Sequence, residues 1–137
     1  MRSITILFVE DEAGDILLTR QVLSESSTPV NLRVARDGEQ AVTILADPEF
    51  RPDLVILDLN IPKISGHQLL EQCKLGSAPV VVFSSSWNEA DMRRSLELGA
   101  REYVRKPLDI DDFSRAIRSM IQKWAKPMSG EANTAAT

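Results

Sequence analysis

Acidic side chains follow two of the apolar runs in this sequence, and they are the first candidates for chemistry. Glu10 and Asp11 come directly after residues 4–9, and Asp58 comes directly after residues 54–57. Carboxylates that meet at one small site repel one another and are costly to desolvate, so a cation is needed to hold them together. Oxygen ligands without histidine favour a hard cation such as Mg²⁺, which combines a few carboxylates with water and phosphate oxygens. The pattern therefore predicts a Mg²⁺ site.

Asp58 is in addition a candidate nucleophile. A carboxylate beside Mg²⁺ can attack a phosphoryl group and form an acyl phosphate, because the metal neutralises the charge that develops. The hydroxyl of Ser84 and the ammonium of Lys106 follow two further apolar runs, and both groups can bond phosphoryl oxygens. A cis bond between Lys106 and Pro107 would aim the lysine across the strand ends. Together these residue types predict a phosphoryl-accepting site.

Each of these residues also has a structural interpretation. Glu10 and Asp11 could simply favour the dipole of a following helix. Asp58 could cap a loop, and Ser84 could end a strand by local hydrogen bonding. Most lysines lie on the surface, so Lys106 alone would be assigned there. The chemical interpretation depends on all of them meeting at one place.

The elements that precede these residues decide whether they meet. Short apolar, β-branched runs predict five strands, at residues 4–9, 32–35, 54–57, 80–83 and 103–104. Helical periodicity fills the segments between them. Strands that are joined through helices run parallel, with helices on both faces of the sheet, so we expect a doubly wound α/β fold. In such a sheet ligands bind at the carboxyl ends of the strands, where the strand order reverses.

Helix signals agree with this alternation. Asp37 and Gln40 have the spacing of a capping box, and Gly99 stands where a left-handed residue would end a helix. In the last predicted helix, an apolar stripe consists of Ile110, Phe113, Ile117, Ile121 and Trp124. Basic residues predicted to face water in that helix are Arg115, Arg118 and Lys123.

Composition limits the fold and the partners. With 137 residues, 43% of them hydrophobic, the chain can bury one core, and we expect one domain over residues 1–126 with a disordered tail over 127–137. The net charge of -4 argues against direct nucleic-acid binding. Cys73 is the only cysteine and can form no internal disulfide, which favours a cytoplasmic protein. Membrane insertion is not expected, because no apolar stretch approaches roughly 20 residues.

Four motifs resemble the receiver domains of two-component response regulators, the CheY-like family. In chain order they are residues 7–11 (LFVED), 53–62 (DLVILDLNIP), 79–85 (PVVVFSS) and 103–107 (YVRKP). The resemblance implies a flavodoxin-like five-stranded sheet in the order 2-1-3-4-5 with five helices. It further implies phosphorylation of Asp58 by a sensor histidine kinase or a phosphotransfer protein. The receiver would catalyse only its own phosphorylation and dephosphorylation, and would otherwise not be an enzyme.

The resemblance also implies a role for each site residue. Mg²⁺ would be held by Asp11, Asp58 and the backbone carbonyl of Asn60, with Glu10 acting through water. The phosphoryl oxygens would be held by Lys106 and Ser84. Movement of Ser84 toward the phosphoryl group would turn Tyr103 inward and alter the face formed by helix 4, strand 5 and helix 5, which would carry the signal.

A narrower similarity is to small stand-alone receivers that pair with phytochrome-type histidine kinases. It is based on residues 57–62, on residues 80–86 and on Trp124 in the last predicted helix. The segment from 73 to 79 is shorter than in that group, and Ser84 stands where many members have threonine. We expect the signal to leave through protein contacts, with a homodimer or a downstream phosphotransfer partner.

Two other functions remain alternatives. A Mg²⁺-dependent phosphohydrolase of the haloacid dehalogenase type would need an acid two residues after Asp58, where Asn60 stands. An unphosphorylated binding module could keep the fold alone. Trp87, before the predicted helix N-cap Asn88, is either a hydrophobic staple or an exposed partner contact.

Overall fold

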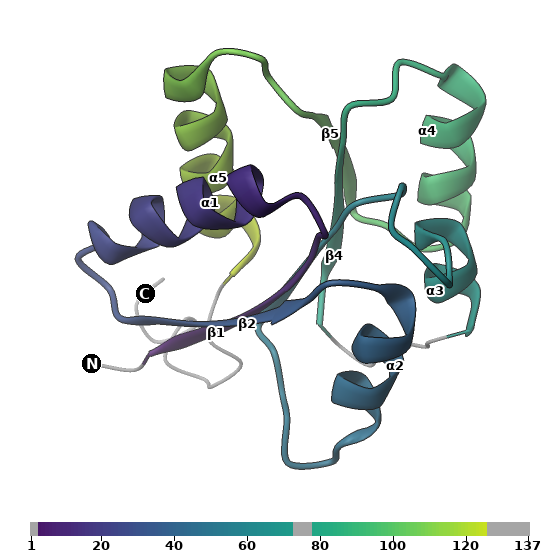
Figure 1. The fold of residues 1–137 in the computed structure, drawn as a ribbon, viewed down its shortest axis with the longest axis horizontal. Coiled ribbons are helices and arrows are strands. Elements are labelled where there is room, and N and C mark those ends of the chain that lie inside the picture. Colours follow the sequence, from purple (N-terminus) through teal and green to yellow (C-terminus); the bar gives the residue numbers. More distant parts are fainter. Residues whose placement is uncertain (1–2, 73–77, 126–137) are drawn as a thin grey trace, which may run out of the picture.

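The structure, a computed structural model, describes residues 3–72 and 78–125. Five strands alternate with five helices along the chain (Figure 1). The strands are β1 (Ile4–Val9), β2 (Val30–Ala35), β3 (Leu54–Leu57), β4 (Val80–Ser84) and β5 (Glu102–Arg105). The helices are α1 (Ala13–Ser24), α2 (Gly38–Ala46), α3 (Gly66–Gln72), α4 (Glu89–Glu97) and α5 (Ile110–Trp124).

All strands pair in parallel in the order β2-β1-β3-β4-β5, which confirms the doubly wound, flavodoxin-like fold. Both edge strands are longer than predicted. Strand β2 begins at Val30 rather than Leu32, and β5 adds Glu102 and Arg105 at its ends. The edge position explains this difference, because an edge strand is partly exposed and tolerates polar residues that interrupt an apolar run.

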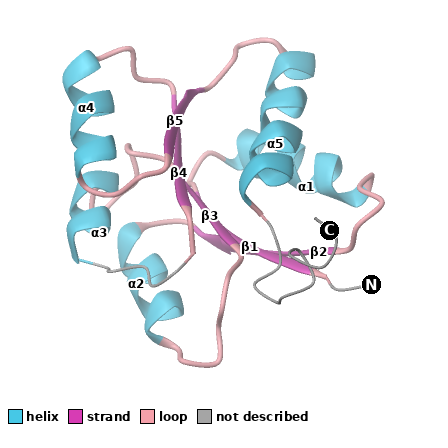
Figure 2. Cartoon of the chain, turned by 180° about the vertical axis from the view of Figure 1, so that it is seen from behind, coloured by secondary structure: helices cyan, strands magenta, loops and turns pink. Residues whose placement is uncertain are grey.

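The sheet separates two apolar layers. Helices α1 and α5 cover one face, and α2, α3 and α4 cover the other (Figures 1 and 2). Side chains of β1 alternate between the layers: Ile6 and Phe8 pack with α1 and α5, while Leu7 and Val9 pack with the opposite helices. Each fully buried side chain of this kind stabilises the fold by about 1.5–3 kcal/mol. The central strands are therefore rigid supports for whatever follows them.

Helix ends follow the predicted signals. Asp37 Oδ1 accepts a hydrogen bond from Gln40 N–H at 2.8 Å, and Asn88 caps α4 through Ala90 N–H at 2.8 Å. Gly99, just after α4, has a φ of 113°, where a residue with a side chain would be strained. Both the capping spacing and the left-handed glycine are thus confirmed.

The α5 stripe is confirmed with one exception. Phe113 and Ile117 are buried, and Ile121 and Trp124 pack against the same core cluster. Ile110, however, is 66% exposed, so its assignment to the buried stripe was wrong. It is the first residue of α5 and lies outside the core cluster, so the helix reaches the sheet only after its first turn.

Some predictions fall on other parts of the chain. Cys73 and the tail over 127–137 lie outside the described residues, as does the predicted boundary at residue 126. Within the described residues, no helix is long and apolar enough to cross a membrane.

Candidate functional site

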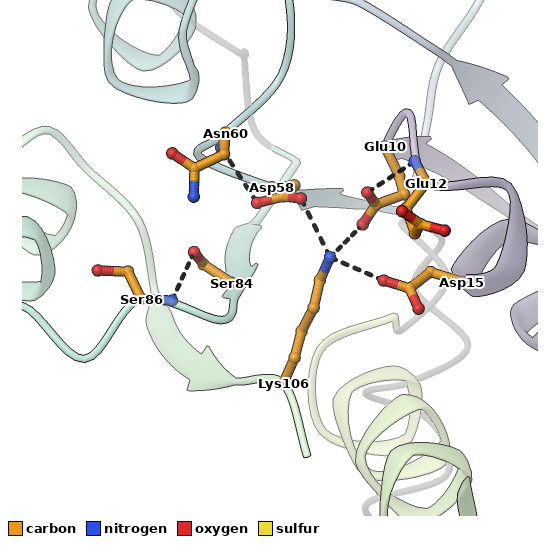
Figure 3. Close-up of polar contacts among 8 residues, drawn as sticks. All are labelled: Glu10, Glu12, Asp15, Asp58, Asn60, Ser84, Ser86 and Lys106. Atoms are coloured by element: carbon orange, nitrogen blue, oxygen red, sulfur yellow. Dashed lines mark hydrogen bonds and ion pairs between the residues drawn. The ribbon is translucent and has the colours of Figure 1, made fainter. Parts of the chain in front are cut away.

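Five of the predicted site residues meet at the carboxyl ends of β1, β3 and β5, where they line an open cavity: Glu10, Asp11, Asp58, Asn60 and Lys106. Lys106 is at its centre (Figure 3). Its Nζ lies 2.6 Å from Glu10 Oε1, 2.9 Å from Asp15 Oδ2 and 3.0 Å from Asp58 Oδ2. The lysine side chain is only 11% exposed, so these ion pairs are shielded from water. We call Glu10, Asp15, Asp58 and Lys106 the acidic pocket.

Backbone pairing beyond the strand ends places the two buried acids. Glu10 N–H donates to Ala35 O at 2.9 Å, and Asp58 N–H donates to Val9 O at 3.0 Å. The sheet ladder thus continues one residue past β1 and β3. Because neighbouring parallel strands lie about 4.8 Å apart, the side chains of Glu10 and Asp58 are brought close together.

The turns that follow fix the orientation of both carboxylates. Glu10 Oε2 accepts from Glu12 N–H at 3.1 Å, and Asp58 Oδ1 accepts from Asn60 N–H at 3.1 Å. Gly66 packs against the loop after Asp58, and its N–H donates to Leu59 O at 3.0 Å. A Cβ at Gly66 would lie 2.6 Å from Leu59 Cα, so only glycine permits this close approach.

Burial and charge set the protonation of the pocket. Burial, followed by the charge of Asp58, raises the pKa of Glu10 to about 7. Burial alone would lower the pKa of Lys106, but its hydrogen bonds to Glu10 and Asp15 and the charge of Asp58 raise that pKa above the ordinary value. The lysine is therefore charged at neutral pH and compensates the acids around it.

The acids fit a hard divalent cation. Glu10, Asp11 and Asp58 each offer a carboxylate oxygen, and these oxygens all lie within 4.8 Å of one another. The donor set contains oxygen only, which matches the preference of Mg²⁺. Asp11 is exposed, so this side of the cluster is open to solvent. Asn60 lies beside this cluster, because its N–H donates to Asp58 Oδ1 and the residue lines the same cavity.

Ser84 and Tyr103 belong to a neighbouring set of hydrogen bonds. Ser84 is fully buried at the end of β4, and its Oγ accepts from Ser86 N–H at 3.2 Å. Tyr103 O–H donates to Ser86 O at 3.1 Å. In the described part of the chain, the hydroxyl of Ser84 makes no hydrogen bond to Asp58 or Lys106 (Figure 3). The main chains of the two strand ends are paired, because Lys106 N–H donates to Ser84 O at 2.8 Å.

Two features of the site differ from the sequence analysis. Asp15 was not among the predicted residues, although its place in the first turn of α1, five residues after Glu10, was a usable signal. No peptide bond in the described residues is cis, so Lys106 reaches the pocket with a trans bond to Pro107. Trans is the default for any peptide bond, and the lysine's long side chain spans the distance.

Trp87 resolves one of the alternatives left open by the sequence. Its side chain is 72% exposed, which excludes a hydrophobic staple in the core. The guanidinium of Arg105 lies over its ring, 3.0 Å from the centroid. This stack connects the β4–α4 loop to the end of β5.

Comparisons with known proteins agree on one family. The sequence model for the response regulator receiver domain matches residues 6–118. Response regulator Rcp1 of Synechocystis sp. (strain ATCC 27184 / PCC 6803 / Kazusa) is 34% identical, over 90% of this chain and 90% of its own. The structure of the phosphorylated cyanobacterial phytochrome response regulator RcpA is 32% identical with a TM-score of 0.85, covering 90% of this chain and 94% of that one. The structure of the Mn²⁺-bound form of response regulator Rcp1 is 32% identical with a TM-score of 0.82, and the match covers 92% of this chain and 97% of that chain.

Proposed function

Because the chain belongs to the family of response regulator receiver domains, we propose that it accepts a phosphoryl group on Asp58 in the presence of Mg²⁺. The observation that carries the proposal is the position of Asp58. Its carboxylate is 8% exposed, bonds Lys106 at 3.0 Å and shares a cluster with Glu10 and Asp11. A nucleophile, a cation and acidic ligands in one cavity are the parts that phosphoryl transfer requires.

The transfer is a displacement at phosphorus. An oxygen of Asp58 forms a bond to phosphorus while the bond from phosphorus to the donor nitrogen of a phosphohistidine breaks, and the electron pair returns to that imidazole. Bound Mg²⁺, held by Glu10, Asp11, Asp58 and the carbonyl of Asn60, would neutralise charge on the phosphoryl oxygens. Lys106 then bonds one phosphoryl oxygen, and Ser84 bonds another.

Signal output follows from the position of Ser84. Its hydroxyl lies in the loop region that also holds Ser86 and, through Ser86 O, the hydroxyl of Tyr103. When Ser84 turns to the phosphoryl group, its bond with Ser86 is given up. The face formed by α4, β5 and α5 changes with it, and a partner protein reads that change.

The phosphoryl donor is a sensor histidine kinase or a phosphotransfer protein. Similarity to a cyanobacterial phytochrome response regulator supports a phytochrome-type kinase. The match between this chain and Rcp1 covers 90% of the length of Rcp1, which supports a stand-alone receiver. A receiver of this kind catalyses only its own phosphorylation and dephosphorylation. Such a receiver would work in the cytoplasm, alone or as a homodimer, without binding nucleic acid.

Phosphorylation is tested by incubating the protein with acetyl phosphate and Mg²⁺ and measuring its mass. One phosphoryl adduct is expected, lost with EDTA and absent in Asp58→Asn. Asp47→Asn, at an exposed position after α2, is the matched control and should keep the adduct. No adduct despite intact Mg²⁺ binding would favour an unphosphorylated binding module. Steady release of phosphate from many small esters would favour a phosphohydrolase.

A further inference from the structure

Asp15 makes a contact that the proposed transfer does not use. Its Oδ2 accepts from Lys106 Nζ at 2.9 Å, a distance similar to the lysine's bonds with Glu10 and Asp58 (Figure 3). Asp15 lies outside the cluster of carboxylates that could share one metal ion, which consists of Glu10, Asp11 and Asp58. Its role therefore concerns the lysine rather than the metal.

We infer that Asp15 is a positioning residue that holds the ammonium of Lys106 beside Asp58 during phosphoryl transfer. The inference rests on the proposed phosphorylation of Asp58. A lysine carries its charge on a flexible four-carbon stem, so fixed acceptors are needed to keep the ammonium in one place. The ammonium has three N–H donors, and Lys106 uses them on Glu10, Asp15 and Asp58.

Neither of the other two acceptors can hold the lysine throughout the reaction. Asp58 loses the charge of the oxygen that bonds phosphorus, so its hold on Lys106 weakens as the product forms. Glu10 belongs to the metal cluster, and a divalent cation there competes with the ammonium for its oxygens. Asp15 neither bonds phosphorus nor belongs to the metal cluster, so its contact with Lys106 is not given up during the transfer.

Asp15 also comes from a separate element. Glu10 follows β1 and Asp58 follows β3, whereas Asp15 projects from the first turn of α1. Its side chain is 26% exposed, compared with 1% for Glu10, so its charge costs less to maintain in the fold. The hydrogen bond to Asp15 also contributes to the raised pKa of Lys106. Lys106 is thus held by a helix as well as by the strand ends, and its third donor can pass from Asp58 to a phosphoryl oxygen.

A double-mutant cycle tests this role. The rate of adduct formation with acetyl phosphate at saturating Mg²⁺ is measured for Asp15→Ala, Lys106→Met and the double variant. Asp15→Ala should slow the reaction about fivefold, with no further slowing when Lys106 is already Met. Asp15→Asn, which keeps an oxygen acceptor, should recover part of the rate. Glu25→Gln is the matched control, because it removes an exposed acid at the other end of α1, and its rate should stay within about twofold.

A second measurement does not depend on phosphorylation. In the metal-free protein, the ¹⁵N ammonium signal of Lys106 should be protected from exchange with water, and Asp15→Ala should broaden it. The inference would be overturned if Asp15→Ala slowed adduct formation equally in the wild type and in Lys106→Met. It would also be overturned if Asp15→Ala left the ammonium signal unchanged. A wild-type protein that forms no adduct would refute the proposed function, and the ammonium signal would then decide separately whether Asp15 holds Lys106.

Discussion

The acidic pocket and the polar groups around the start of α4 lie at the same edge of the sheet, yet different forces hold them. In the pocket, three carboxylates surround one buried ammonium. Around α4, neutral and local hydrogen bonds predominate. We call this second region the hydroxyl network; its members are Ser84, Ser86, Asp91, Ser95, His67 and Tyr103. The first region suits chemistry at a fixed point, and the second suits movement.

The hydroxyl network ties several elements to the loop after β4. Ser86 O–H donates to Asp91 Oδ2 at 2.9 Å, and Ser95 O–H donates to Asp91 O at 2.8 Å. His67 Nε2 lies 3.0 Å from Ser95 Oγ, which links α3 to α4. A neutral hydrogen bond adds only about 0.5–1.5 kcal/mol to stability, and a bond to a carboxylate, such as that of Asp91, adds about 1.5–3 kcal/mol. The network can therefore rearrange at a cost that one phosphoryl contact would offset.

The largest effect should come from removing the charge at the centre of the pocket. Lys106→Met leaves Glu10 and Asp58 buried without a cation, so we expect a loss of about 3 kcal/mol in the free energy of unfolding without Mg²⁺. Added Mg²⁺ should restore part of this loss, because it supplies the missing positive charge. Urea unfolding with and without Mg²⁺ measures both effects.

Lys63→Met is the matched control for that experiment. Lys63 pairs with Asp37 and Glu39 at 3.6 and 3.3 Å, but its side chain is 55% exposed. Exposed pairs contribute about 0–1 kcal/mol, so this variant should be nearly as stable as the wild type and insensitive to Mg²⁺. Similar losses for both lysines would remove the distinction between a buried ionic site and its surroundings.

A smaller effect should appear in the pH dependence of the pocket. The pKa of Glu10 is raised from 4.5 to about 7, so the folded state holds a proton that the unfolded state has released between these values. The contribution of Glu10 is therefore most favourable below pH 4.5 and is lost as the pH rises toward 7. Without Mg²⁺, Glu10→Gln should gain stability relative to wild type across this window, by up to about 1.4 kcal/mol for each pH unit. A constant difference between the two proteins would contradict the prediction.

The two regions also differ in how far the sequence predicted them. Glu10, Asp58 and Lys106 each follow a buried strand directly, and parallel strands present their carboxyl ends at one edge, so the strand pattern alone brought them together. Asp15 was missed because it lies on a helix, where the direction of a side chain depends on how the helix packs against the sheet. The position of Asp15 in the first turn of α1 indicates that it lies near the strand ends, but the contact with Lys106 depends on that packing, which is a tertiary property.

Among the members of the hydroxyl network, only Ser84 and Tyr103 were named from the sequence, and the others were missed for another reason. Ser86, Asp91 and Ser95 are residue types that cap helices and end strands in any protein, so their spacing has no special meaning. His67 meets Ser95 only because α3 and α4 pack side by side on the sheet. Polar contacts between neighbouring helices can therefore be recognised only once the fold is known, whereas acids at strand ends can be recognised from the sequence.

The smallest effect should come from the hydroxyl network. Ser95 is fully buried, and its hydroxyl joins Asp91 O to His67. Ser95→Ala should lower the free energy of unfolding by about 1 kcal/mol, since it leaves buried polar partners unsatisfied. Adduct formation with acetyl phosphate should continue at the wild-type rate, because no atom of Ser95 reaches the pocket. Urea unfolding and mass measurement on the same sample check both statements.

Ser24→Ala gives the matched control, because Ser24 O–H also bonds a carbonyl of its own helix, Gln21 O at 2.7 Å, but in an exposed place. Alanine favours helix over serine at both positions, so this gain cancels when the two variants are compared. The difference between them isolates the buried contacts of Ser95 with His67 and Asp91. If Ser95→Ala slowed adduct formation as strongly as a change in the pocket, the two regions would have to act as one cooperative unit, and the division between fixed chemistry and movable hydrogen bonds would fail.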